Sequence, residues 1–179
     1  MNFFIQELQK SGFPLVNHQP ASENNGDWLG RSVTLQFRAG VCNALDLAQP
    51  SIQWSTMGGG KQPQILTRSI EIMDIHSITV STSKDVKGKM NANDDEDVQC
   101  FFTLTSKSGD VHVFEALNKD ECHRVVIGIK NLNGRYSKLM VAGDEDVLPE
   151  YFDVEKNPEE LQLVPEQAMI ILSHAFLNL

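Results

Sequence analysis

Few residues of this chain have the type and spacing that catalysis or metal binding requires. The histidines are spread along the whole sequence: His18, His76, His112, His123 and His174. None of them shares a metal-ligand spacing with another histidine, a cysteine or an acid. No segment resembles a nucleophile elbow or a Cys-His signature. We therefore predict a protein that is not an enzyme and has no metal and no cofactor.

Three cysteines, Cys42, Cys100 and Cys122, leave one thiol over in any pairing. Free thiols in a reducing compartment are therefore expected.

The segment Gly58-Gly59-Gly60-Lys61 contains glycine and lysine, but it lacks the spacing of a phosphate-binding loop, and no helical pattern follows it. We predict a surface hairpin loop there.

Charge is distributed unevenly along the 179 residues, whose net charge is −9. Residues 144–179 hold nine acids against Lys156 alone, and residues 94–97 add four consecutive acids. Duplex nucleic acid needs a clustered basic face, so we expect no nucleic-acid partner, although a small anion site stays open. We expect no transmembrane segment and no secretion signal, and thus a cytoplasmic protein, with a peripheral place at membranes as the alternative.

The elements that must position any site are mostly short strands. Alternating apolar residues or β-branched content predict seven of them, at 13–16, 33–37, 52–54, 69–75, 77–81, 98–105 and 111–116. Before them, residues 1–10 can form a short helix with Phe3, Phe4 and Leu8 on one face. This pattern predicts a mainly β fold, a sandwich or barrel of antiparallel strands.

One long amphipathic helix follows the strands. Asn118 with Glu121 three residues later is a capping box, and the apolar stripe runs from Cys122 to Leu132. The stripe either continues to Met140, with Gly143 as the stop, or is interrupted at Asn133-Gly134. A single helix in this position can cover one open end of a barrel.

We divide the chain into a domain over 1–143 and an appendage over 144–179. Residues 144–160 are expected to form an acidic linker that is extended or partly disordered. A helix opening at Val164-Pro165-Glu166 then carries Met169, Leu172 and Phe176 on one apolar face. So short a helix must bury that face, either on the domain, on a protein partner or in self-association.

The order of these elements resembles a pleckstrin-homology (PH) domain, closest to the type found in phospholipase C delta. The resemblance rests on an ordered set of segments: Gly12-x-x-Leu15-Val16, Arg31–Leu35, Ile52–Trp54, Ser69–Ile78, Cys100–Leu104, Phe114–Ala116 and Val126–Ile129. It implies a seven-stranded barrel of two antiparallel sheets, capped by the helix. The chain departs from the family at Val125, where the helix usually carries tryptophan.

Lipid-binding members of that family carry two lysines near the end of the first strand and an arginine on the second. Here the lysine positions hold Asn17 and Gln19, and only Arg31 is retained. A polyphosphate head group needs several charge-assisted hydrogen bonds at once. We therefore expect an adaptor-like signalling module that recognises a protein partner.

Two alternatives remain from the sequence. One is an altered phosphoinositide site that uses Arg31 with Lys61 or Lys107. The other is a regulatory fragment of a phospholipase-type signalling enzyme, although no calcium-loop pattern follows Gly143.

Overall fold

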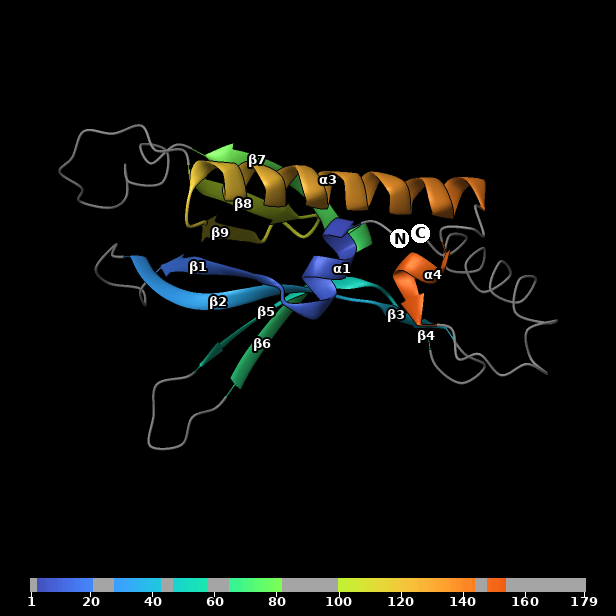
Figure 1. Cartoon of the computed structure of the whole chain (residues 1–179), viewed down its shortest axis with the longest axis horizontal. Helices are drawn as coiled ribbons and strands as arrows, with labels where there is room; N and C mark the ends of the chain where they lie inside the picture. The colour runs from blue at the N-terminus through green and yellow to red at the C-terminus, as the bar shows by residue number, and fades with distance from the viewer. Residues whose placement is uncertain are drawn as a thin grey trace.

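The computed structural model describes residues 3–20, 28–42, 47–57, 65–81, 100–143 and 148–153. These residues form a mainly β fold with one long helix, as the sequence predicts (Figure 1). Seven strands make up the main sheet: β1 (Phe13–Pro20), β2 (Trp28–Arg38), β5 (Ser51–Met57), β6 (Ile65–Glu71), β7 (Ile75–Ser81), β8 (Phe101–Ser106) and β9 (Val111–Glu115). All seven lie where strands are predicted, although their boundaries differ.

The strand order is β6-β5-β2-β1-β9-β8-β7, and every pairing is antiparallel. This order consists of two groups of strands, β6-β5-β2-β1 and β9-β8-β7. The two groups are joined where β1 pairs with β9 over three residue pairs, Val16 to His18 against Val113 to Glu115. In Figure 1, β7, β8 and β9 lie next to the long helix, and the other four strands lie below them. The seven strands thus form one continuous hydrogen-bonded antiparallel order.

The segment 69–75 is predicted as one strand, and that prediction is wrong in its second half. The strand β6 ends at Glu71, and Ile72–Asp74 form a 3-10 turn, η1, before β7 begins. The backbone amide of Ile72 donates to the carbonyl of Pro50 at 2.9 Å. Ile72 and Ile75 are three residues apart, so in a regular strand their side chains would point to opposite faces of the sheet. The turn changes the direction of the backbone between them, and both side chains are buried in the core.

Helix α3 (Lys119–Ala142) is continuous, so Asn133-Gly134 does not interrupt it. The Asn118 side chain accepts from the Glu121 amide at 2.8 Å, and the Glu121 carboxylate accepts from the Leu117 amide at 3.1 Å. Gly143 ends the helix in the left-handed conformation, with φ of 65°. Both predicted ends of this helix are confirmed. In the described part of the chain, no helix is long and apolar enough to cross a membrane.

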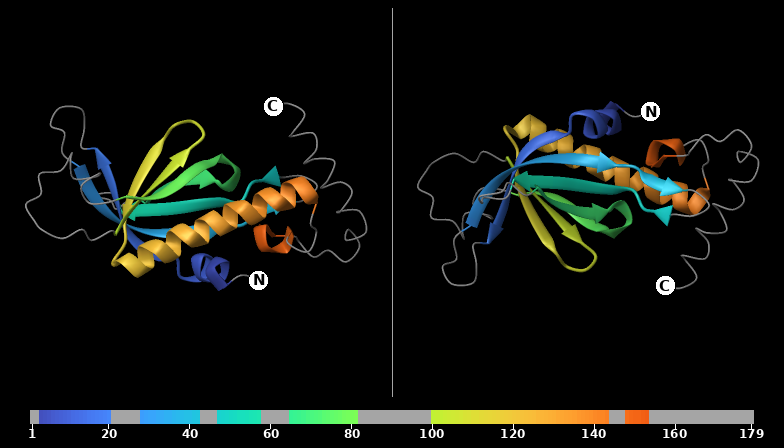
Figure 2. Two further views of the ribbon diagram at one scale, coloured as in Figure 1. Left: turned by 90° about the horizontal axis from the view of Figure 1, so that it is seen from above. Right: turned by 90° about the horizontal axis from the view of Figure 1, so that it is seen from below.

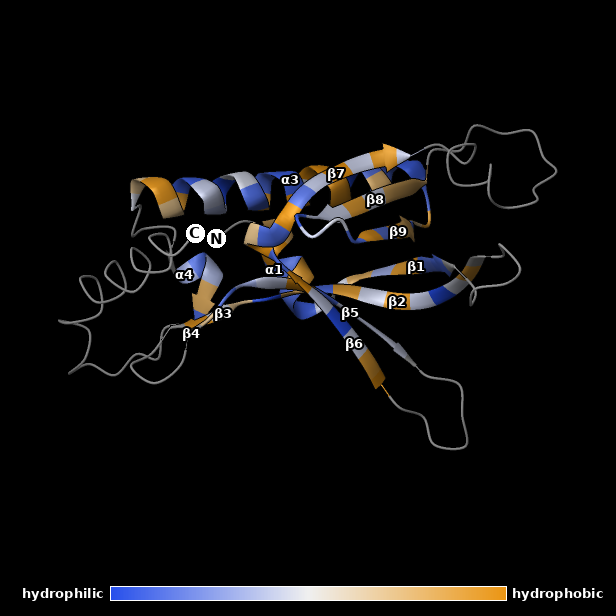
Figure 3. Ribbon diagram, turned by 180° about the vertical axis from the view of Figure 1, so that it is seen from behind, coloured by the Kyte–Doolittle hydropathy of each residue, from blue (hydrophilic) through white to orange (hydrophobic). Residues whose placement is uncertain are grey.

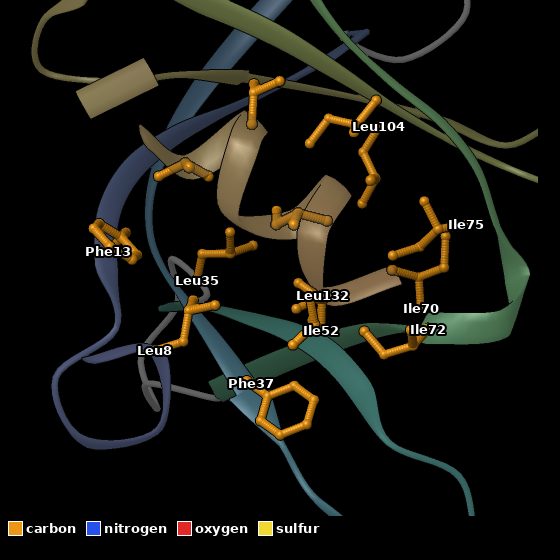
Figure 4. Packing of buried hydrophobic residues seen from close by; sticks show 14 of the residues in the cluster. Leu8, Phe13, Leu35, Phe37, Ile52, Ile70, Ile72, Ile75, Leu104 and Leu132 are labelled. Carbon is orange, nitrogen blue, oxygen red and sulfur yellow. The ribbon is translucent and has the colours of Figure 1, made fainter. Parts of the chain in front are cut away.

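The core lies between α3 and the concave face of the sheet. Figure 4 shows side chains from several strands and from α3 converging there, among them Leu35, Ile52, Leu104 and Leu132. Val125, at the position where the PH resemblance would place a tryptophan, is fully buried. Aliphatic burial therefore suffices to hold the helix against the strands.

Helix α1 (Phe3–Lys10) lies against β2 and reaches α3 through Phe4 and Glu7. Ile5 and Leu8 are fully buried, whereas Phe3 is 87% exposed, so the predicted face is wrong for Phe3. Phe4 stacks on Phe13 with ring centroids 5.5 Å apart. Its ring also covers Gly128, because a Cβ at that position would overlap it.

Residues 148–153 pack on this body, although they lie in the segment 144–160 that is predicted to be an extended or partly disordered linker. Helix α4 (Leu148–Tyr151) leads into β10 (Phe152–Asp153), which pairs in parallel with β3 (Gly40–Cys42), and β3 pairs with β4 (Leu47–Ala48). Tyr151 and Phe152 are buried, and the Tyr151 hydroxyl donates to the Leu132 carbonyl at 2.9 Å. Aromatic burial thus overrides the acidic composition of this segment.

Candidate functional site

Arg31 is exposed near the start of β2, in a shallow depression of about 810 Å³. Residues 29–34 line this depression together with Ser55 and Thr56 of β5 and Ile65 of β6. Leu29 and Ile65 are exposed to 52% and 69%. In Figure 3 the adjoining end of β6 is coloured as hydrophobic. Arg31 therefore stands among exposed apolar side chains.

Hydrogen-bonded amides occupy the two positions where the PH resemblance places lysines. Asn17 pairs across the strands with Arg31 and is fully buried, and its Nδ2 donates to the Val113 carbonyl at 3.1 Å. Gln19 Nε2 donates in turn to Asn17 Oδ1 at 2.7 Å. An uncharged group suits this buried site, since burying a lone charge is costly. The strand β1 thus gives Arg31 no second cation.

Lys107 lies in the turn between β8 and β9, and its amide donates to the Asp74 carbonyl in η1 at 2.8 Å. Lys107 is not among the residues that line the depression around Arg31. Lys61, Met169, Leu172 and Phe176 lie outside the described residues.

The two cysteine thiols that the structure describes are held in unreactive surroundings. Cys100 and Cys122 are buried free thiols, and burial raises the pKa of both, that of Cys122 to about 11. A thiol reacts as its thiolate, so these two are inert near neutral pH. Within the described ranges, no group of three or more histidines, cysteines or acids could hold a metal ion.

His112 on β9 packs edge-on against Trp54, with ring centroids 4.8 Å apart. Burial lowers the pKa of His112, the charge of Arg68 lowers it further, and Asp110 acts in the opposite direction. The imidazole is therefore neutral at pH 7 and adds no charge for binding an anion.

A groove of about 440 Å³ separates β7 from α3. Its β7 wall consists of residues 75–78, and its α3 wall consists of Ile129, Lys130, Asn133, Gly134 and Ser137. Figure 2 shows the two elements running side by side. The walls are joined where Asn133 Nδ2 donates to the Ile75 carbonyl at 3.4 Å, next to a register shift between Ile75 and Ser77.

Gly134 keeps this groove open. A Cβ at Gly134 would meet no atom within 4 Å, whereas one at Gly128, on the flank covered by α1, would overlap Phe4. Two glycines six residues apart on one helix therefore have opposite surroundings. The sequence signals Gly134 only as a helix-breaking residue and does not indicate its place on a groove wall.

The strand β7 is an edge of the sheet. It pairs with β8 on one side, and no strand among the described residues pairs with its other side. An edge strand presents unpaired N–H and C=O groups to which another extended chain can add. Edge and groove together form a surface suited to binding a peptide in extended conformation.

In sequence comparisons, no protein-family model matches the chain, and no curated protein matches it either.

Proposed function

We propose that this chain is a non-catalytic, PH-like binding module that recognises a protein partner, as an adaptor in intracellular signalling does. In this proposal the strands form a barrel of two antiparallel sheets and α3 caps it. The short join between β1 and β9 supports that division, because only three residue pairs connect the two groups of strands. The strand order also agrees with this division. The strands of one group, β1, β2, β5 and β6, all come before those of the other group, β7, β8 and β9, along the chain.

The observation that carries the proposal is the free edge of β7 beside the groove. Adding an extended peptide to a sheet edge is a recurring mode of recognition, in which main-chain hydrogen bonds supply affinity and side-chain pockets supply specificity. The strand β6 is the other edge of the sheet. The β7 edge is favoured because α3 provides a second wall for the side chains of an added strand.

A peptide selection tests this proposal without a known partner. We would select a phage-displayed peptide library on the full chain and on Gly134→Trp, whose indole would fill the groove. Asn131→Trp is the matched control, since Asn131 is exposed on the same helix and does not line the groove. We expect peptides that bind the wild type and Asn131→Trp but not Gly134→Trp. Peptides that bind all three proteins equally would refute the proposal, provided that circular dichroism shows both variants folded.

A second candidate, an altered phosphoinositide site, is favoured by the depression around Arg31. Its exposed Leu29 and Ile65 could contact lipid while the guanidinium contacts a head group. Against it, neighbouring positions 17 and 19 are neutral amides. The test is sedimentation with vesicles carrying each phosphoinositide, at low and physiological salt, for the wild type and Arg31→Ala. Selective binding that Arg31→Ala abolishes would establish this second function, and no difference between the two proteins would exclude Arg31 as the ligand.

A further inference from the structure

Charge on α3 is strongly asymmetric along its length. Acidic side chains occur only in the first turn, at Asp120 and Glu121. From Cys122 to Ala142 the helix carries two arginines, two lysines and His123, and no acid. The helix would thus present a basic surface wherever no other element neutralises it.

Both arginines are neutralised by elements that pack on the helix. Arg124 forms an ion pair with Glu7 of α1, and Arg135 forms one with Glu150 of α4 at 2.9 Å. Lys130 has no ion pair with any residue that the structure describes, and it lines the groove beside β7. The groove wall of α3 therefore carries a positive charge that none of the described residues neutralises.

The facing wall does not supply the missing negative charge. The strand β7 reads Ile-His-Ser-Ile-Thr-Val-Ser and contains no acid. The nearest acid along the chain, Asp74, precedes the strand in η1. Among the groove-lining residues, the charged or chargeable ones are Lys130 and His76.

We propose that the segment bound in this groove is an extended, acidic stretch of a partner protein, with Asp or Glu placed to face Lys130. This inference rests on the proposed function and adds the chemistry of the partner to it. Alternate residues of an added strand point to the same side, so acids at every second position would face α3. The contribution is local, because charges farther away than about 8 Å are largely screened at physiological salt.

Charge reversal tests the proposal. The peptide selection would be repeated on full-length Lys130→Glu and on Lys138→Glu, which makes the same charge change on the same helix outside the groove lining. We expect groove-dependent peptides from the wild type to be enriched in Asp and Glu by about fivefold. Lys130→Glu should instead select Lys and Arg, and Lys138→Glu should behave as the wild type.

The outcomes separate this inference from the proposed function. Groove-dependent peptides without acid enrichment, or with the same enrichment on Lys130→Glu, would overturn the inference and leave the proposed function standing. No groove-dependent peptides on any protein would overturn both. A fourth protein, with Glu155, Glu159, Glu160 and Glu166 all changed to Gln, tests the acidic tail of the chain as the occupant. If peptides are selected only by that protein, the tail fills the groove in the wild type. That result would overturn the inference that the occupant belongs to a separate partner.

Discussion

The two glycines of α3 provide the sharpest test of how the helix is surrounded. Replacing glycine by alanine inside a helix stabilises it by about 1 kcal/mol, because glycine loses more backbone freedom on folding. Gly134 is exposed, and its Cβ would meet no atom within 4 Å. We therefore expect Gly134→Ala to raise the free energy of unfolding by the full amount, about 1 kcal/mol.

Gly128→Ala gains the same free energy from helix propensity, but a steric overlap cancels this gain. The new Cβ would overlap the Phe4 ring, so the ring must leave its place against Phe13. An aromatic pair is worth about 0.5–1.5 kcal/mol beyond its buried area, and overpacking in general costs about 1–3 kcal/mol. We expect Gly128→Ala to be less stable than Gly134→Ala by about 2 kcal/mol.

Urea unfolding followed by circular dichroism measures both changes. The control is the Phe4→Ala background, in which the obstacle to a Cβ at Gly128 is gone. There, Gly128→Ala should stabilise the protein by about 1 kcal/mol, as Gly134→Ala does. The reasoning would be refuted if Gly128→Ala stabilised the wild-type background as much as Gly134→Ala, because α1 would then not cover that flank of α3.

Three further predictions concern the cap, the tyrosines and the amide at position 17. Asn118→Ala should lower the free energy of unfolding by about 1 kcal/mol, because the hydrogen bond from the Glu121 amide is lost. The control Asn131→Ala lies on the exposed helix surface and should not lower it, and urea unfolding measures both variants. The chain has two tyrosines, both fully buried, and burial raises the pKa of Tyr151 to about 12 and that of Tyr136 further. Since an unfolded tyrosine titrates near about 10, the stability that the neutral phenols contribute is complete below that pH and is lost as pH rises toward 12. Phenolate absorbance should therefore stay low at pH values where unfolded protein already ionises, and early titration of the native protein would contradict the buried placement. Finally, Asn17→Leu leaves the Val113 carbonyl and the Gln19 amide without their partner, so it should lower the free energy of unfolding by about 1–3 kcal/mol. The control Gln36→Leu, on the exposed side of β2, should change it by less than about 0.5 kcal/mol, and urea unfolding measures both.

Much of the secondary structure could be predicted because its signals are local. Apolar alternation located the strands, and the residues Asn118, Glu121 and Gly143 located the ends of α3, since caps act within a single turn. Local signals failed where a tertiary contact decided the conformation. The turn at Ile72–Asp74 and the short strands β3, β4 and β10 contain too few residues to show a period.

The candidate site was less predictable than the fold. Arg31 is exposed, but Lys107 does not line the depression around it. Lys130 and Gly134 gave no functional signal in the sequence, because a groove wall is defined by what lies opposite to it. Tyr151 and Phe152 sit in an acidic segment whose composition suggests a linker, yet they are buried against the body.

By itself, the sequence determined the class of fold, the long capped helix and the neutral amides at positions 17 and 19. These depend on residue type and on spacing within one element. The tertiary structure alone decided that β7 is an edge, that α1 and α4 neutralise the arginines of α3, and that Lys130 faces a groove without a counter-charge. Each of these depends on which distant segments meet, and that is settled by the packing of the whole core rather than by any local pattern.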